Sequence, residues 1–224
     1  MIQFPYSTYV NRSVPKNAFY SHLDVNTSMK ARFIDDIERI SWLAKLTPST
    51  LNIEDGKAVH EITVFQVMLK REDVSDDVFL LIDRQMPRHV LFVLQYGERY
   101  RLLLNYKEWT DESKGVFRIL HSFRTEWMDN DALKLNIEGT SLDKVYESFA
   151  GQVSGFGTHS SDDTKRIIEL QETLKQKQRI LEALQKKVRT EKQFNLQLQL
   201  NAEARALKGE VASLQEEMDK LKKS

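Results

Sequence analysis

Residues 61–94 read EITVFQVMLKREDVSDDVFLLIDRQMPRHVLFVL, two strongly apolar runs separated by a polar, acidic segment. The first run, which extends over 59–70, places apolar side chains on both faces, as is typical of a central strand. Ser75 and the acids after it predict a helix over 76–85, because the helix dipole favours negative charge in its first turn. The second run, 89–95, predicts another strand. The stretch therefore indicates a strand, a helix and a strand in succession.

The flanking segments complete an α+β domain. A helix capped by Thr27 or Ser28 is predicted to continue to about Leu46, because apolar residues recur there at helical spacing: Phe33, Ile37, Ile40 and Ala44. After the quoted stretch we expect a hairpin partner, a further strand and a closing helix, over 99–105, 116–125 and 142–150. The first 25 residues, with two prolines, are expected to form an irregular arm. These elements predict a domain with a mixed sheet.

The composition divides the chain into three parts. Twenty of the 21 aromatic residues lie at or before Phe156, and all four prolines lie in the first 87 residues. Between Gly157 and Gly209 there is neither glycine nor proline. We therefore predict a globular domain over 1–150, a linker rich in glycine and serine over 151–161, and a long helical tail over 162–224.

Charge and composition exclude several classes of protein. Lys and Arg number 33, as do Asp and Glu, so the chain as a whole is not a basic nucleic-acid binder. It contains no cysteine, which excludes disulfides, thiolate metal sites and a cysteine nucleophile. The apolar runs are far shorter than the ~20 residues of a membrane span, and no secretory signal is visible. We expect a cytoplasmic protein that does not associate with membranes.

Motifs for catalysis are weak. The five histidines show no metal-ligand spacing, and neither a nucleophile elbow nor a dinucleotide fingerprint is present, so no metal or cofactor is expected. One enzymatic alternative is a degenerate metal-dependent nuclease, in which a carboxylate holds Mg²⁺ and a lysine positions the nucleophile. Its candidate residues are Asp83, Lys70 and Lys107. Asn105 or Gln66 stands where the second carboxylate would be, which weakens metal binding. The lysines can equally be solvated residues at strand ends.

The tail carries a coiled-coil pattern in two phases. Apolar residues step by three and four along both of its halves, which predicts a long C-terminal helical coiled coil. Val188 and Ala204 are 16 residues apart, two more than two heptads, so the winding must change or the helix must break between Glu191 and Asn201. The predicted core positions are Leu170, Leu174, Leu181, Leu184, Val188, Leu207, Val211, Leu214, Met218 and Leu221.

Charge predicts how the tail pairs. Residues 175–192 hold seven Lys or Arg against two Glu, whereas residues 203–219 hold two against five acids. Antiparallel pairing sets the basic block against the acidic block, and parallel pairing does not. The lack of Gly and Pro argues against a tight turn within the tail. We therefore expect the antiparallel pairing to join two chains, which makes the protein a homo-oligomer. A hairpin within one chain is the alternative. Nucleic-acid binding by the basic block is a further alternative.

Three segments resemble a known family. They are FPYSTYVNRSVPKNAFY (4–20), the quoted stretch (61–94) and RTEKQFNLQLQLNAEARALKGEV (189–211). In this order they resemble the bacterial and archaeal family of unknown function numbered 4391. The resemblance assigns no catalytic residues. It implies a companion of helicases and DNA methyltransferases in restriction-type defence clusters.

The resulting hypothesis is a non-catalytic accessory subunit of a bacterial DNA-defence or restriction-type assembly. Its partner would be a helicase or a DNA methyltransferase. The phase break lies inside the third resembling segment, which makes it the candidate docking point, with Glu191, Phe194, Asn195 and Asn201 as its polar and aromatic residues.

Overall fold

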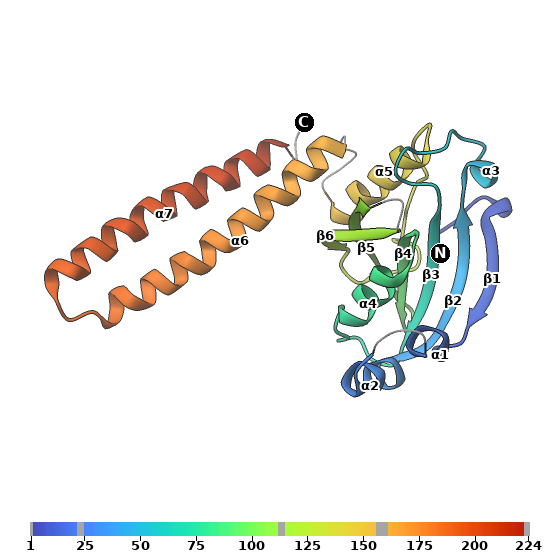
Figure 1. Cartoon of the computed structure of the whole chain (residues 1–224), viewed down its shortest axis with the longest axis horizontal. Helices are drawn as coiled ribbons and strands as arrows, with labels where there is room; N and C mark the ends of the chain where they lie inside the picture. The colour runs from blue at the N-terminus through green and yellow to red at the C-terminus, as the bar shows by residue number, and fades with distance from the viewer. Residues whose placement is uncertain (1, 22–24, 112–114, 156–160, 222–224) are drawn as a thin grey trace. The chain divides into compact units, whose positions relative to one another are not determined.

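The computed structural model describes residues 2–21, 25–111, 115–155 and 161–221. It divides into two compact units, Met1–His159 and Ser160–Ser224 (Figure 1). The first is an α+β unit around a seven-stranded mixed sheet, and the second consists of two long helices. The elements in chain order are η1 (Tyr6–Thr8), β1 (Tyr9–Val14), α1 (Asn17–Tyr20), α2 (Thr27–Asp35), β2 (Ile37–Leu46), α3 (Pro48–Leu51), β3 (Ile62–Leu69), α4 (Asp77–Gln85), β4 (His89–Tyr96), β5 (Arg99–Asp111), β6 (Val116–Arg124), β7 (Met128–Asp129), α5 (Leu142–Ser154), α6 (Ser161–Thr190) and α7 (Phe194–Leu221).

The sheet confirms the order predicted for residues 61–94. Its strands follow one another as β1-β2-β3-β4-β5-β6, and β7 pairs with β5. β3 and β4 pair in parallel, from Ile62 opposite His89 to Met68 opposite Gln95, and α4 connects them. The other pairs among the described strands are antiparallel. β3 is central and its side chains are buried on both faces, as its continuous apolar run predicts.

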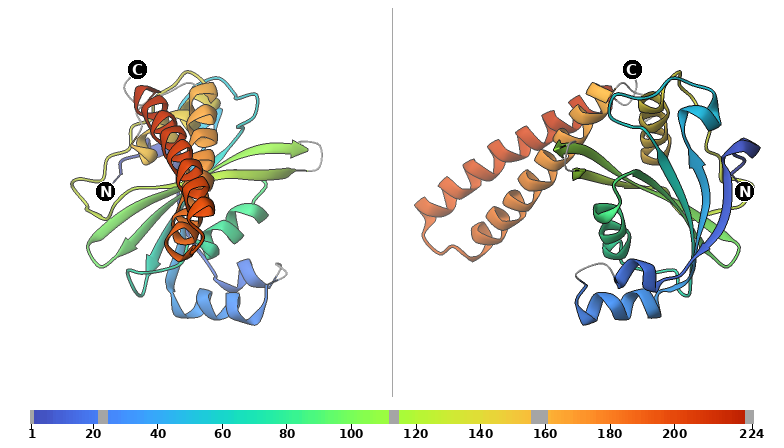
Figure 2. Two further views of the ribbon diagram at one scale, coloured as in Figure 1. Left: turned by 90° about the vertical axis from the view of Figure 1, so that its left-hand side faces the viewer. Right: turned by 45° about the vertical axis from the view of Figure 1, so that its right-hand side comes forward.

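A hydrophobic core joins α4 to one face of the sheet. Phe79 and Ile82 of α4 pack against Phe65 of β3 and Phe92 of β4, and the rings of Phe79 and Phe92 lie 5.4 Å apart. Phe33 brings α2 into the same core. The ribbon views of Figure 2 show α4 alongside the sheet. α4 is thereby fixed along its apolar side, and the last turn of this helix supports the buried site described below.

The helix predicted from Thr27 to Leu46 is wrong in its second half. α2 ends at Asp35, and Asn26, not Thr27 or Ser28, caps its start by accepting a hydrogen bond from the Met29 N–H at 2.8 Å. Residues 37–46 form β2 instead. The register of β2 against β3 shifts at two places, 37–39 and 42–44. Each shift adds one residue to β2, which interrupts the alternation of buried and exposed side chains along the strand. The buried side chains of Ile37, Ile40 and Ala44 therefore recur every three or four residues, as they would on one face of a helix.

The N-terminal arm is more ordered than the sequence predicts. Tyr9–Val14 forms β1, which pairs antiparallel with β2 at the edge of the sheet. A bulge interrupts the pairing between Tyr9 and Arg12, and Asn11 has a positive φ of 49°. Prolines flank β1 rather than interrupt it, so the strand is compatible with the two prolines that suggested an arm.

Helix α5 extends into the predicted linker. It continues to Ser154 and ends at Gly155, whose φ of 73° is the left-handed conformation that suits glycine after a helix. The first four residues of the predicted 151–161 linker are therefore helical. Residues 156–160 of that linker lie outside the described residues.

The second unit is a helical hairpin within one chain. α6 and α7 run antiparallel, as the ion pairs Arg166–Glu217 and Lys177–Glu210 require. The chain reverses over three residues, 191–193, where the phase break is predicted. Glycine is not needed there, because the Glu191 carboxylate accepts hydrogen bonds from the N–H groups of Lys192 and Gln193, both at 2.8 Å. The antiparallel pairing therefore joins two helices of the same chain, which is the alternative that the sequence left open. Pairing between two chains is not required to explain this antiparallel arrangement.

Cysteine crosslinking will test the hairpin on a background without natural cysteines. Leu181 and Ala204 are half-buried on the facing sides of the two helices. We expect the pair Leu181→Cys and Ala204→Cys to form a disulfide within one chain, visible as faster migration of monomer in non-reducing electrophoresis. Leu181→Cys with Ala202→Cys is the control, because Ala202 is exposed. Predominant crosslinking to a covalent dimer would contradict the hairpin.

Candidate functional site

Asp83 and Lys107 form a buried ion pair at the C-terminal end of α4. Lys107 Nζ lies 2.6 Å from Asp83 Oδ1, and both side chains are 0% exposed. The ammonium also donates to the backbone carbonyls of Asp83, Met86 and Arg88, at 3.1, 3.2 and 2.5 Å. A helix leaves its last carbonyls without partners and carries partial negative charge at that end. Lys107 of β5 therefore has two roles: its ammonium caps the C-terminal end of α4, and it also neutralises the charge of Asp83.

A bulge in the pairing of β5 with β6 lies beside this lysine, and its additional residue is Leu120 of β6. The register between β5 and β6 shifts between Tyr106 and Lys107. At the same point the Tyr146 hydroxyl of α5 donates to the Asn105 carbonyl at 2.9 Å and accepts from the Lys107 N–H at 3.3 Å. Bulges commonly redirect a side chain, and here α5 supplies the hydrogen bonds that stabilise one. The position of Lys107 thus depends on β5, β6 and α5.

Asn105 completes the polar cluster. Its side chain is 0% exposed, and its Oδ1 accepts from the Ser122 hydroxyl at 2.7 Å. Asp83 Oδ2 and Asn105 Nδ2 are both buried, and the interaction of the Asn105 side chain with Asp83 lowers the pKa of that carboxyl. An amide donor and a carboxylate oxygen are complementary groups, so Asn105 belongs to the same polar cluster as the ion pair.

Burial shifts the proton affinities of the pair in opposite directions. Loss of hydration raises the pKa of the Asp83 carboxyl and lowers the pKa of the Lys107 ammonium. The attraction between the two charges opposes both shifts. The Phe117 ring, whose centroid lies 4.4 Å from Lys107 Nζ, adds a cation–π contact. These contacts favour the charged pair, although neither group touches solvent.

His89 lies next to the pair in an aromatic cage. Its ring is 4.5 Å from that of Tyr146, 5.2 Å from Phe117 and 6.5 Å from Trp109, measured between centroids, and each contact is edge-to-face. Burial and the nearby Lys107 charge lower the pKa of His89 to about 3. The imidazole is therefore neutral at physiological pH.

The structure brings together only part of the predicted nuclease constellation. Asp83, Lys107 and Asn105 meet, but Lys70 lies at the other end of β3, where its Nζ donates to the Ile34 carbonyl at 2.8 Å. Gln66 is hydrogen-bonded to Gln95 instead. Within the described ranges, no group of three or more His, Asp or Glu is placed to hold a metal ion. Because the Lys107 ammonium is enclosed and already meets four oxygen acceptors, the arrangement favours a structural clamp over a reacting group.

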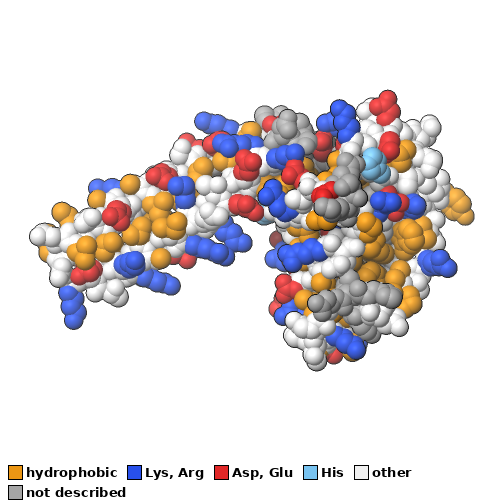
Figure 3. Space-filling model, viewed as in Figure 1, with side chains coloured by type: hydrophobic (Ala, Val, Ile, Leu, Met, Phe, Trp, Pro, Cys, Tyr) orange, Lys and Arg blue, Asp and Glu red, His pale blue; other side chains and the backbone are white. Residues whose placement is uncertain are grey.

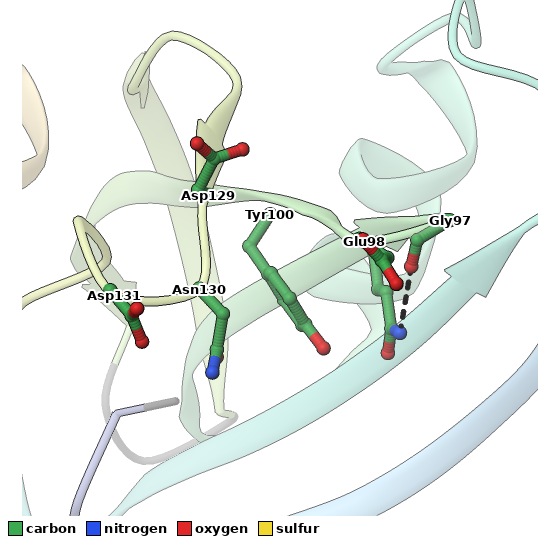
Figure 4. Close-up of a pocket in the computed structure, with 7 residues that line it drawn as sticks. Gly97, Glu98, Tyr100, Asp129, Asn130 and Asp131 are labelled. Carbon is green, nitrogen blue, oxygen red and sulfur yellow. Dashed lines mark hydrogen bonds between the residues drawn. The ribbon is translucent and has the colours of Figure 1, made fainter.

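An open pocket lies beside the β4–β5 turn. It has a volume of about 440 Å³ and is shown in Figure 4. The Gln95 amide donates to the Gly97 carbonyl at 3.1 Å at its rim. Three of the lining residues are acidic and none is basic, so the pocket disfavours anions. The residues that line it are Gln95, Gly97, Glu98, Tyr100, Asp129, Asn130 and Asp131.

The hairpin is a second candidate site because its apolar stripe is incompletely covered. Near its open end, a buried cluster of Leu170, Leu174 and Met218 is flanked by Val211, Leu214 and Leu221. From Lys175 to Glu217, no described side chain is buried. The remaining predicted core positions face the other helix but are only half-buried, namely Leu181, Leu184, Val188 and Leu207.

The predicted docking residues surround the turn of the hairpin. Phe194 is the first residue of α7 and is 73% exposed, and Leu198 one turn later is 62% exposed. Asn195 and Asn201 are also exposed, whereas Glu191 is half-buried and binds the turn N–H groups. The structure therefore exposes three large apolar side chains at this end, Phe194, Leu196 and Leu198, of which Phe194 and Leu198 are the most exposed.

A family model described as a domain of unknown function, DUF4391, matches residues 2–211. The chain belongs to the DUF4391 family. The match extends over the α+β unit, α6, the turn and α7 as far as Val211, so the hairpin is part of the DUF4391 domain. A search of curated proteins and a search of solved structures found no match. In the part of the DUF4391 chain that the structure describes, no helix is long and apolar enough to span a membrane.

Sequence reasoning missed His89 and Tyr146. His89 is the first residue of the second predicted strand and Tyr146 lies in the middle of the predicted closing helix, and neither belongs to a motif. A signal for Asp83 was present: it lies one helical turn after Phe79, so it falls on the apolar side of α4. A charged residue at such a position needs a buried partner.

Proposed function

We propose that this DUF4391 chain is a non-catalytic interaction subunit that binds a partner protein through the turn-proximal part of the α6–α7 hairpin. One observation carries the proposal: 43 successive positions of the hairpin, Lys175 to Glu217, contain no buried side chain although they carry a regular apolar stripe. Two helices can cover only one side of such a stripe. Contiguous apolar surface left in water is characteristic of an interaction site.

The chemistry of the hairpin indicates the occupant. A shallow groove of about 620 Å³ runs along one side of α7, with Leu198, Ala202 and Ala204 as its apolar part. Arg205 and Lys208 supply positive charge along the groove, and Gln185 and Asn201 complete the lining. A helix with an apolar stripe and acidic flanks matches this surface, and its addition would turn the hairpin into a three-stranded coiled coil.

A different protein suits this surface better than a second copy does. Residues 175–208 hold nine Lys or Arg and three Glu, a net charge of +6. Two copies that met turn to turn would place these like charges side by side. The resemblance to the family supports a helicase or DNA methyltransferase of a bacterial DNA-defence or restriction-type assembly as the partner. A homo-oligomer remains a separate proposal that a mass measurement by light scattering will check.

Co-expression with the helicase and the methyltransferase of the same gene cluster tests the proposal. We expect a tagged chain to retain one of them, and the variant Phe194→Ser with Leu198→Ser to retain at least tenfold less, because interface affinity is concentrated in aromatic and large apolar anchors. Both side chains are exposed, so the hairpin itself should be unaffected.

The matched control is Gln193→Ser with Gln199→Ser, which changes two exposed polar residues of the same region. This control should retain the partner as the unmodified chain does. Equal retention by the Phe194/Leu198 variant would show that the docking site lies elsewhere.

A further inference from the structure

A ridge of cations lies along the side of α6 that faces away from α7. Leu184 is half-buried and marks the side that faces α7. At 100° per residue, four exposed cations lie on the opposite side of the helix. They are Lys175, Arg179, Lys186 and Arg189. Figure 3 shows Lys and Arg side chains along the edge of the hairpin.

These cations differ from those near the open end of the hairpin. There, Arg166 pairs with Glu217 at 2.7 Å and Lys177 pairs with Glu210 at 2.5 Å, so their charge is compensated across the hairpin. Among the residues that the structure describes, none of the four ridge cations makes an ion pair. Glu182, the acid on the same ridge, makes none either. The ridge therefore presents a net charge of +3 to solvent.

We propose that this ridge binds the phosphate backbone of duplex nucleic acid. From residue 175 to 189 it extends about 21 Å, which corresponds to about six phosphates of one strand at 3.4 Å each. Successive cations are about 6, 10.5 and 4.5 Å apart along the helix axis, so each can reach a separate phosphate. A row of Lys and Arg along one helix face is the footprint of backbone binding.

Two features favour a duplex over other polyanions. The ridge contains no aromatic side chain, and single strands are bound largely by base stacking on aromatic rings. It also contains no apolar anchor between its cations, whereas a protein interface concentrates its affinity in such anchors. The apolar stripe lies on the other side of α6. Nucleic-acid binding is thus independent of partner docking, and one hairpin has room for both.

Salt dependence of DNA binding by the full chain tests the proposal. The probe is a fluorescein-labelled 20-bp duplex of mixed sequence, followed by anisotropy. Four phosphate contacts predict a slope of about −3.6 for log K against log salt, or about a 150-fold loss of affinity between 50 and 200 mM salt. Arg179→Gln with Lys186→Gln should reduce the slope to about −1.8 and the loss to about 12-fold.

The control Arg166→Gln with Lys177→Gln changes the net charge equally but leaves the ridge intact. It should keep the slope of the unmodified chain, and Lys175→Gln with Arg189→Gln should reproduce the ridge effect. A slope shallower than −1, or an equal reduction in the control, would overturn the proposal. Competition by poly-glutamate as strong as that by DNA per unit charge would assign the ridge to acidic proteins instead, and equal binding to anionic lipid vesicles would assign it to membranes.

Discussion

Replacing Lys107 with methionine is expected to lower the free energy of unfolding by about 4 kcal/mol, because it leaves the Asp83 carboxylate buried without a counter-charge. The backbone carbonyls of Asp83, Met86 and Arg88 lose this donor as well. The deficit should grow as the pH rises. An unpaired buried carboxyl has a raised pKa, so the folded state binds its proton more tightly than the unfolded state does.

Urea unfolding followed by circular dichroism measures this effect. The double variant Asp83→Leu with Lys107→Met removes both charges and should recover at least about 2 kcal/mol of the loss. Lys70→Met is the control, because the ammonium of this exposed lysine donates to a single backbone carbonyl, that of Ile34, and the substitution should cost less than about 1 kcal/mol. A Lys107→Met variant as stable as the unmodified protein would contradict the clamp.

The second large effect concerns acid. Unfolding exposes His89, whose pKa then returns from about 3 to about 6.5. Between these values the unfolded state binds more protons than the folded state, so stability falls as the pH falls. From pH 6 to pH 4 this group should remove about 2–3 kcal/mol of unfolding free energy.

The variant His89→Phe isolates this contribution, because it keeps an aromatic ring in the cage and cannot be protonated. Between pH 6 and pH 4 the free energy of unfolding of this variant should fall by about 2–3 kcal/mol less than that of the unmodified protein. Urea unfolding at pH 4, 5 and 6 provides the comparison. Parallel pH profiles for the two proteins would show that His89 is accessible to protons in the folded state.

Periodicity predicted the parts of the fold in which each element is regular. β3, α4 and β4 begin and end within three residues of their predicted bounds. β5 begins at the predicted residue but continues six residues past the predicted end at 105, so the segment that holds Lys107 was not predicted to be strand. β2 was mistaken for helix because its two bulges disrupt the alternation that identifies a strand. Bulges arise from pairing with a neighbouring strand, so the sequence of one strand does not reveal them.

The tail shows what a phase break can and cannot predict. The 16-residue spacing located the interruption of the helix, and the charge blocks predicted antiparallel helices. The sequence did not show whether the two antiparallel helices belong to one chain or to two. A hairpin within one chain required a turn that contains neither glycine nor proline. That turn is made by side-chain caps, chiefly from Glu191, which composition does not indicate.

The buried site was predictable only in fragments. Asp83 and Lys107 were singled out as candidate residues, yet their pairing joins residues 24 positions apart and depends on the packing of α4 against β5. The sequence also could not distinguish a lysine that reacts from one that caps a helix. That difference lies in its burial and its four oxygen partners, both of which come from tertiary structure.

The bulge in β1 bears on how this protein avoids unwanted association. An edge strand exposes unpaired backbone groups to which a strand from another molecule can add, and long rows of such additions lead to fibrils. In β1 the left-handed residue Asn11 distorts that edge, and the exposed Arg12 beside it would place charge against an incoming strand. Growth through this edge of the sheet is thereby discouraged, while the hairpin exposes the apolar side chains of Phe194 and Leu198.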